Sequence, residues 1–282
     1  MAVALYSHDP DGGDEFKARC LLSNMSILGV RSTWCILPGE GYSREFYAML
    51  IDYGYEIALH YDALRRPWSE LEFSRQYDAV SSETGVRLVS NKNHYLRWKG
   101  WTEFYRWCER KGIRVDQSKG PTKVHNLGFI YGTCHPYFPI DDWRHHNRFL
   151  DVLAINLQDQ EMWRGWPNHE VLAVLNNFTY QAYIHYGVVH HLFHPAHIHV
   201  AYEVLNGTVR FIRSLPGMGI WISREINDWE RARRGVTFNF VTLTAHGVSS
   251  RYCKGTHRVL CRYNDRKRQG SHRCRCRWRT NL

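Results

Sequence analysis

Residues 5–15 read LYSHDPDGGDE, and the interpretation of the whole sequence starts from this stretch. Its apolar lead is typical of a buried parallel strand, and Pro10 with the following glycines predicts a sharp turn into a loop. Loops at such strand ends carry the chemistry of α/β enzymes. Because Pro10 favours an extended backbone at Asp9, we expect Asp9 and Asp11 to point to the same side, with His8 pointing away. The stretch therefore predicts paired carboxylates, unless the two acids only cap the next helix or form turn contacts.

Outward from this strand, strand-like and helix-like stretches alternate regularly. Asp14 is placed to cap a helix that ends at Gly29, and Ser69 with Glu72 forms the capping-box pattern of a later helix. Further helices are expected before Gly54, over 102–111 and within 169–182, and strands over 32–37, 55–60, 86–90, 113–118, 127–131, 150–157 and 188–193. Seven or eight parallel strands with helices between them predict an α/β barrel rather than an open sheet.

The positive charge lies at the C-terminal end of the chain. The net charge is +10, and residues 251–282 hold eleven lysines and arginines against one acid, which accounts for the whole excess. We expect one main domain over 1–232 and a basic, poorly ordered segment over 233–282. That segment has three interpretations: an arm for anionic partners, a solvated tail without function, or an unselected C-terminus such as a frame-shifted reading would give. The last two are favoured, so nucleic acid is not an expected partner.

The sequence shows no run of eighteen apolar residues and no basic N-terminal segment followed by a long apolar stretch. We therefore expect neither a membrane span nor a signal peptide. Four cysteines, Cys20, Cys35, Cys108 and Cys134, occur singly in apolar or aromatic contexts, as reduced core thiols do. The expected location is the cytoplasm, without a membrane partner, and the oligomeric state stays open.

Histidines and carboxylates dominate the expected C-terminal ends of the strands, which line one mouth in a parallel barrel. One carboxylate with two imidazoles and an open fourth position is the ligand set of a catalytic divalent metal, with zinc as the first candidate. A single histidine is more often a core or loop residue, but the coincidence of several at strand ends favours a metal. The residues are Asp9, Asp11, His60, His94, His135 and the cluster 194–199.

Two segments, GVRSTW at 29–34 and GYEIALH at 54–60, resemble the polysaccharide deacetylase family. In that family an aspartate pair ends the first strand, a G-hydrophobic-E-I-G-L-H segment ends the third, and a late strand carries a histidine followed by proline. The segments HDPD, LHYD, SNKNHYLRW, GTCHPYFP and FHPAHI together resemble a divergent branch with an Asp-x-Asp first motif. The resemblance covers residues 3–200 and implies a distorted (β/α) barrel.

Carried over position by position, the resemblance implies that Asp9 is the general base and that Asp11 and His60 are metal ligands. The family motif has another histidine four residues after the one that matches His60, and Leu64 stands there in this chain. Another group must therefore supply the third ligand. We expect His94, which follows the fourth strand and can reach the same mouth, with His135 or water as the alternatives.

The family's arginine-proline-tyrosine segment, which shapes the substrate and oxyanion pocket, is replaced here by a segment that contains His135 and Tyr137. The residue that orients the base is therefore not identified. His194, followed by proline, matches the late histidine that protonates the leaving amine, and His197 is the competing choice. The histidines of 185–199 could instead form a structural or adventitious metal-binding surface.

The resemblance implies a metal-dependent hydrolase of non-peptide carbon–nitrogen bonds that removes an acetyl group from an acetylated amino sugar or polysaccharide. The cofactor would be a divalent metal, first of all zinc, and the partner a carbohydrate substrate. Two alternatives stay open. Because of Leu64 and the missing arginine, the chain could be a carbohydrate-binding pseudoenzyme, or the same centre could hydrolyse a non-sugar amide.

Overall fold

The computed structural model of this chain describes residues 2–142, 147–160, 166–236, 238–244, 247–252, 260–262 and 275–277, with side chains as far as residue 236. The chain divides into two compact units, Met1–Asn227 and Asp228–Leu282. Within the described ranges, no helix combines the length and the apolar character needed to cross a bilayer. The boundary expected between residues 232 and 233 stays a prediction.

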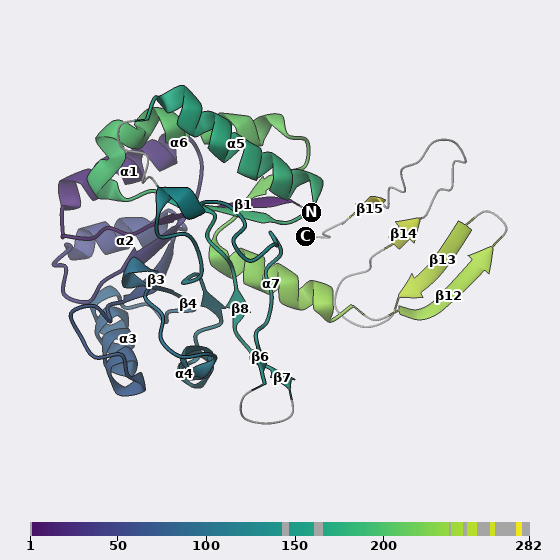
Figure 1. Cartoon of the computed structure of the whole chain (residues 1–282), viewed down its shortest axis with the longest axis horizontal. Coiled ribbons are helices and arrows are strands. Elements are labelled where there is room, and N and C mark those ends of the chain that lie inside the picture. Colours follow the sequence, from purple (N-terminus) through teal and green to yellow (C-terminus); the bar gives the residue numbers. More distant parts are fainter. Residues whose placement is uncertain are drawn as a thin grey trace. The chain divides into compact units, whose positions relative to one another are not determined.

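The first unit is built on one parallel sheet that curls into a distorted barrel, as the sequence predicts (Figure 1). Its strands are β1 (Val3–His8), β2 (Thr33–Ile36), β3 (Glu56–Tyr61), β4 (Ser90–Asn93), β5 (Val115–Asp116), β8 (Leu153–Ala154), β9 (Asp159–Gln160), β10 (Val188–Leu192) and β11 (Gly219–Ile220). Eight of them follow the order β8-β5-β4-β3-β2-β1-β10-β9, and β11 pairs with β1 beside this path. The end strands β8 and β9 share no ladder within the described residues, so the barrel is open at one seam.

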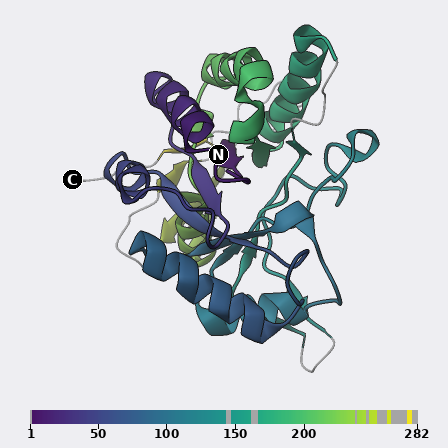
Figure 2. The ribbon, with the colours of Figure 1, turned by 90° about the vertical axis from the view of Figure 1, so that its left-hand side faces the viewer.

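Helices α1 to α6 surround this sheet on its outer side (Figures 1 and 2). Asp14 accepts a hydrogen bond from Lys17 N and begins the first helix, and Ser69 accepts one from Glu72 N at the start of the third, so both predicted caps are confirmed. The α-helices are α1 (Glu15–Ile27), α2 (Arg44–Asp52), α3 (Glu70–Thr84), α4 (Glu103–Lys111), α5 (Asn168–Ile184), α6 (Ile198–Ser214) and α7 (Ser223–Arg234), and the short 3-10 turns are η1 (His94–Leu96), η2 (Val124–Asn126) and η3 (Pro195–His197).

The barrel contains a buried polar group and a separate apolar cluster. The buried carboxylate of Glu56 accepts hydrogen bonds from Ser90 Oγ at 2.5 Å, Ser223 Oγ at 2.7 Å and Thr33 Oγ1 at 3.1 Å. The apolar cluster consists of Val3, Leu5, Val115, Leu153, Ile155, Val188 and Ile226. The candidate site lies at the C-terminal ends of the strands.

Two predicted strands differ from the structure. β4 begins at Ser90, where the predicted strand over 86–90 ends, and its four residues are polar and buried. Residues 127–131 form turns instead of a strand, because Gly128 and Gly132 adopt φ values of 100° and 68° that interrupt an extended backbone. The second of these differences leaves the barrel intact, whereas the first determines what the site contains.

The remaining strands form two small antiparallel sheets. The first joins β6 (Ile140–Asp141) to β7 (Arg148–Phe149). The second belongs to the other unit and contains β12 (Phe238–Thr244), β13 (Gly247–Tyr252), β14 (Leu260–Arg262) and β15 (Arg275–Arg277) in that order. Most of the basic stretch 251–282 lies outside the described residues.

Candidate metal centre

A cavity of about 520 Å³ opens at the C-terminal ends of the barrel strands. Six of the eight site residues expected from the sequence line it: Asp9, Asp11, His60, His94, His194 and His197. The rest of the wall consists of Tyr95, Leu96, Thr122, Gln160, Leu192 and Ala196. The volume lies within the range of natural ligand sites, about 300–1,000 Å³. This arrangement agrees with the expectation that the strand ends bring these side chains together at one mouth of the barrel.

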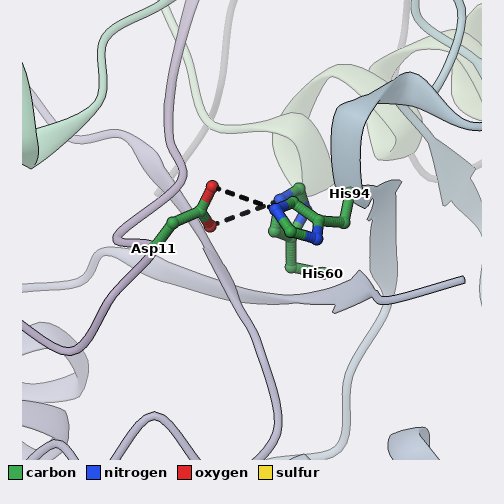
Figure 3. A group of neighbouring side chains, drawn as sticks. All are labelled: Asp11, His60 and His94. Carbon is green, nitrogen blue, oxygen red and sulfur yellow. Dashed lines mark ion pairs between the residues drawn. The ribbon is translucent and has the colours of Figure 1, made fainter. Parts of the chain in front are cut away.

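Three of these residues converge as a group that could hold a metal ion (Figure 3). Asp11, His60 and His94 each offer one ligand atom, and these atoms all lie within 4.8 Å of one another. His60 Nε2 is 3.5 Å from Asp11 Oδ1, and His94 Nε2 is 3.4 Å from Asp11 Oδ2. The three come from different elements, since Asp11 follows β1, His60 belongs to β3 and His94 follows β4.

In each of the two histidines, a hydrogen bond to Nδ1 fixes the orientation of the imidazole ring. His60 Nδ1 donates to the carbonyl oxygen of Lys92 at 2.8 Å, and His94 Nδ1 donates to Asp62 Oδ1 at 3.3 Å. Both Nε2 atoms are thereby left to face Asp11. An acceptor behind a histidine is the usual support of a metal-binding imidazole, because it selects the tautomer and raises the basicity of the ring.

The donor set fits a divalent metal. Asp11 Oδ1 and His60 Nε2 are buried, and neither has a hydrogen-bond partner within the part of the chain that the structure describes. Buried polar atoms are almost always satisfied, so two that face one another across 3.5 Å call for an additional group between them. Burial lowers the pKa of His60, which keeps this imidazole in the neutral form that binds metals. One carboxylate with two imidazoles leaves room for further ligands, as in catalytic zinc sites.

Asp9 lies beside this group and belongs to a buried ion pair. Its carboxylate receives Lys92 Nζ at 2.8 Å, and Lys92 Nζ also donates to Ser7 Oγ at 2.6 Å. Burial alone would raise the pKa of Asp9, but the charge of Lys92, followed by those of His60 and His194, holds it well below the usual range. Asp9 is therefore an ionised carboxylate 3.6 Å from His60 Nε2.

Lys92 and Asp62 are the two site residues that sequence reasoning missed. Lys92 is fully buried, and its pairing with His60 across β3 and β4 turns both side chains into the barrel. Lys92 therefore provides the cation beside the base that the sequence left unidentified. Asp62 stands two positions after His60 in the LHYD segment, a spacing that could have indicated a second acid at the same mouth.

The two late histidines also line the cavity, and His194 lies close to Asp9. His194 Nε2 is 3.9 Å from Asp9 Oδ2, and the ring centroids of His194 and His197 are 5.7 Å apart. The short turn η3 between them carries both side chains into the lining. His8 points the other way, as expected, because its Nδ1 bonds to Phe193 O and its ring packs on Trp34.

His135 and Tyr137 are not brought to the cavity, which corrects the pocket assignment made from the sequence. His135 is exposed, and its backbone N–H donates to Thr133 Oγ1. Tyr137 forms a bridge with Ala154 of β8, and its side chain packs against the main hydrophobic core, which contains Tyr105 of α4. Strand pairing thus directs Tyr137 toward the outer helices rather than the mouth.

Comparison with known proteins supports the fold. No protein-family model and no curated protein matches the sequence. Among solved structures, a protein from Mycobacterium smegmatis described as a polysaccharide deacetylase aligns with a TM-score of 0.59 and 14% sequence identity, over 82% of this chain and 91% of that one. A probable polysaccharide deacetylase from Pseudomonas aeruginosa PAO1 aligns with a TM-score of 0.62 and 13% sequence identity, over 81% of this chain and 91% of that one. An allantoinase aligns with a TM-score of 0.63 and 12% sequence identity, over 83% of this chain and 92% of that one.

These structures define the class of fold as the distorted (β/α) barrel of polysaccharide deacetylases, and the resemblance seen in the sequence is confirmed at that level. At identities of 12–14%, the likeness concerns the path of the backbone. What the site does must be inferred from its own residues.

Proposed function

We propose that this protein is a divalent-metal-dependent hydrolase of non-peptide carbon–nitrogen bonds that releases acetate from an acetylated amino sugar. One observation carries the proposal: Asp11, His60 and His94 converge at the mouth of the barrel beside the ionised Asp9. The shared backbone of deacetylase structures supports the choice of substrate class.

Each side chain has a role that its position supports. Asp11, His60 and His94 would hold the ion, which when bound supplies Lewis acidity for a carbonyl oxygen and makes water more acidic. Asp9 accepts a proton from the attacking water, because Lys92 keeps its carboxylate ionised and in place. His194, whose Nε2 lies 3.9 Å from Asp9 Oδ2, would act as an imidazolium and give a proton to the departing nitrogen. Water adds across the amide bond, and the products are acetate and a free amine.

A second candidate follows from the third comparison. The allantoinase aligns with a TM-score of 0.63, so this barrel also occurs in a protein named for a substrate other than a polysaccharide. The same constellation in this chain would then hydrolyse a non-sugar amide. The substrate class is therefore part of the test and not an assumption of it.

The experiment combines metal analysis with acetate release. The purified protein, loaded with zinc, is assayed against N-acetylglucosamine oligomers and against small amides without a sugar ring. We expect acetate from the oligomers, loss of both metal and turnover in Asp11→Ala, and retained metal without turnover in Asp9→Asn. Turnover of the small amides alone would favour the second candidate. Sugar binding without any turnover would identify a carbohydrate-binding pseudoenzyme.

A further inference from the structure

The turn η1, which directly follows β4, has an unusual backbone. Tyr95 adopts φ 55° and ψ 24°, and Leu96 adopts φ 50°. Left-handed conformations are unfavourable for residues with a side chain, and they persist where the surroundings fix them, most often at functional sites. Four non-glycine residues have positive φ in the described ranges, and these two are the consecutive ones that line the cavity.

Hydrogen bonds around Asn93 fix this turn. Asn93 Nδ2 donates to the carbonyl oxygen of Arg97 at 3.0 Å, and Asn93 N donates to Ser118 Oγ at 2.9 Å. Arg97 N also donates a hydrogen bond to the carbonyl oxygen of His94 at 3.2 Å. Because Asn93 is buried in the last position of β4, the strained turn is attached to the sheet itself rather than to a free loop.

The strain places two neighbouring side chains at different levels of the same cavity. Leu96 is nearly buried and packs with Leu157 and Leu192 in a small apolar cluster. Tyr95 is 72% exposed, and its ring meets the ring of His94 at a centroid distance of 4.7 Å and an angle of 67°. An aromatic ring that touches a candidate ligand along one side and is otherwise open offers an apolar surface at the rim of the cavity.

We propose that Tyr95 is a substrate-binding residue whose ring stacks on a sugar ring of the substrate next to the bond that is hydrolysed. This inference rests on the proposed function and specifies its substrate contact. A pyranose has an apolar face of C–H groups and a polar edge of hydroxyls. The ring of Tyr95 suits the face, while Thr122, Gln160 and His197 line the same cavity and offer polar groups to the hydroxyls.

A matched control exists in the same chain. Tyr186 is also a tyrosine at φ 55°, is 65% exposed, and is not among the residues that line the cavity. Removing either ring deletes the same atoms from the same kind of backbone. A difference between the two variants therefore reports the location of the ring and not the loss of an exposed tyrosine.

The test measures binding of the disaccharide of N-acetylglucosamine by calorimetry to metal-free protein, and KM and kcat for its deacetylation by zinc-loaded protein. We expect Tyr95→Ala to weaken binding and raise KM about tenfold, which is the size of one aromatic stacking contact, with a much smaller change in kcat. Tyr95→Phe keeps the ring and should restore most of the affinity. Tyr186→Ala should bind as the wild type does.

A fourth variant separates binding from folding. Tyr95→Gly relieves the left-handed strain, so its melting temperature should rise while its affinity falls as in Tyr95→Ala. If the wild type binds the disaccharide and Tyr95→Ala binds it equally well, the stacking role is wrong and the proposed function stands. If the wild type neither binds nor deacetylates any acetylated sugar, both proposals fail. A Tyr95→Phe variant as weak as Tyr95→Ala would assign the contact to the hydroxyl and overturn stacking.

Discussion

Lys92 and Asp9 form a buried ion pair of 2.8 Å beside the candidate metal centre. Lys92 stands in the middle of β4, and Asp9 follows the end of β1, two strands that are not neighbours in the sheet. The pair therefore spans the inside of the barrel. Its strength depends on the low local dielectric and on Ser7, which occupies a further donor position of the ammonium.

Replacing Lys92 by methionine should leave the carboxylate of Asp9 buried without its nearest cation. We expect the free energy of unfolding to fall by about 3 kcal/mol, as measured by urea denaturation at pH 7. The double variant Lys92→Met/Asp9→Asn removes both charges and should recover about 2 kcal/mol of that loss. Effects that simply add would show that the two residues do not stabilise each other.

The assignment of His94 as third ligand makes a comparison of two histidines decisive. His94→Ala should reduce zinc occupancy about as much as His60→Ala, because each removes one of three converging donors. His135→Ala should retain the metal, since His135 is exposed and does not line the cavity. Elemental analysis after dialysis against a weak chelator measures the difference. Equal losses in His94→Ala and His135→Ala would contradict the assignment.

Asp62 should tune the metal site without touching the metal. Asp62→Asn keeps an oxygen for the backbone N–H groups of Leu64 and Arg65 but removes the charge that faces His94 Nδ1. We expect zinc affinity to fall about tenfold, in line with other changes behind metal-binding histidines. Competition with a chromophoric chelator gives the value, and Asp52→Asn, at an exposed acid on α2, is the control. An unchanged zinc affinity would show that Asp62 only stabilises the turn that follows it and does not support His94.

Because of Lys119, we expect the free energy of unfolding of the first unit to change with pH in the alkaline range. Burial lowers the pKa of Lys119 to about 8, with its ammonium over the ring of Trp98 and the charge of Asp116 opposing the shift. Between this value and the unfolded pKa near 10.4, the unfolded chain holds a proton that the folded chain has released. The free energy of unfolding should therefore rise with pH across that window. Solvent screening of this partly buried group reduces the gain to about 1 kcal/mol.

The measurement compares wild type with Lys119→Met at several values of pH from 7.5 to about 10. Tyrosines titrate near the upper end in both proteins, so the difference between the two curves isolates Lys119. A difference that stays flat across the window would mean that Lys119 is solvated in the folded state.

The C-terminal segment is expected to be dispensable for the barrel. Truncation after Arg234 removes the basic stretch 251–282, whose mutual repulsion disfavours compact packing. The melting temperature of the remaining chain should stay within a few degrees of the full-length value. A fall of many degrees on truncation would show that residues after 234 help to hold the barrel together.

Much of the fold was predictable because strand ends and helix caps leave local signals. Asp14 and Ser69 cap helices by hydrogen bonds to residues three positions later, so the pattern is contained in a few letters. His60 and Asp11 were predicted as neighbours by one rule, that parallel strands end at the same edge. These inferences need no knowledge of long-range contacts.

Lys92 shows what such rules cannot reach. The segment SNKN looks like a loop, because hydrophobic periodicity assumes that buried strand positions are apolar. Here two of the buried polar side chains donate to distant partners, Lys92 Nζ to Asp9 and Asn91 Nδ2 to Asp116. The failure for Tyr137 has a similar origin, because its direction is set by a bridge to Ala154 that no local pattern records.

The origin of the three candidate ligands in different strands has a mechanical consequence. An ion held by Asp11, His60 and His94 would join segments that follow or belong to β1, β3 and β4, and so act as a removable cross-link across one edge of the sheet. Such a link binds the folded chain and not the unfolded one, so apparent stability would rise with the concentration of free ion. Metal supply would then set the lifetime of the protein as well as its chemistry.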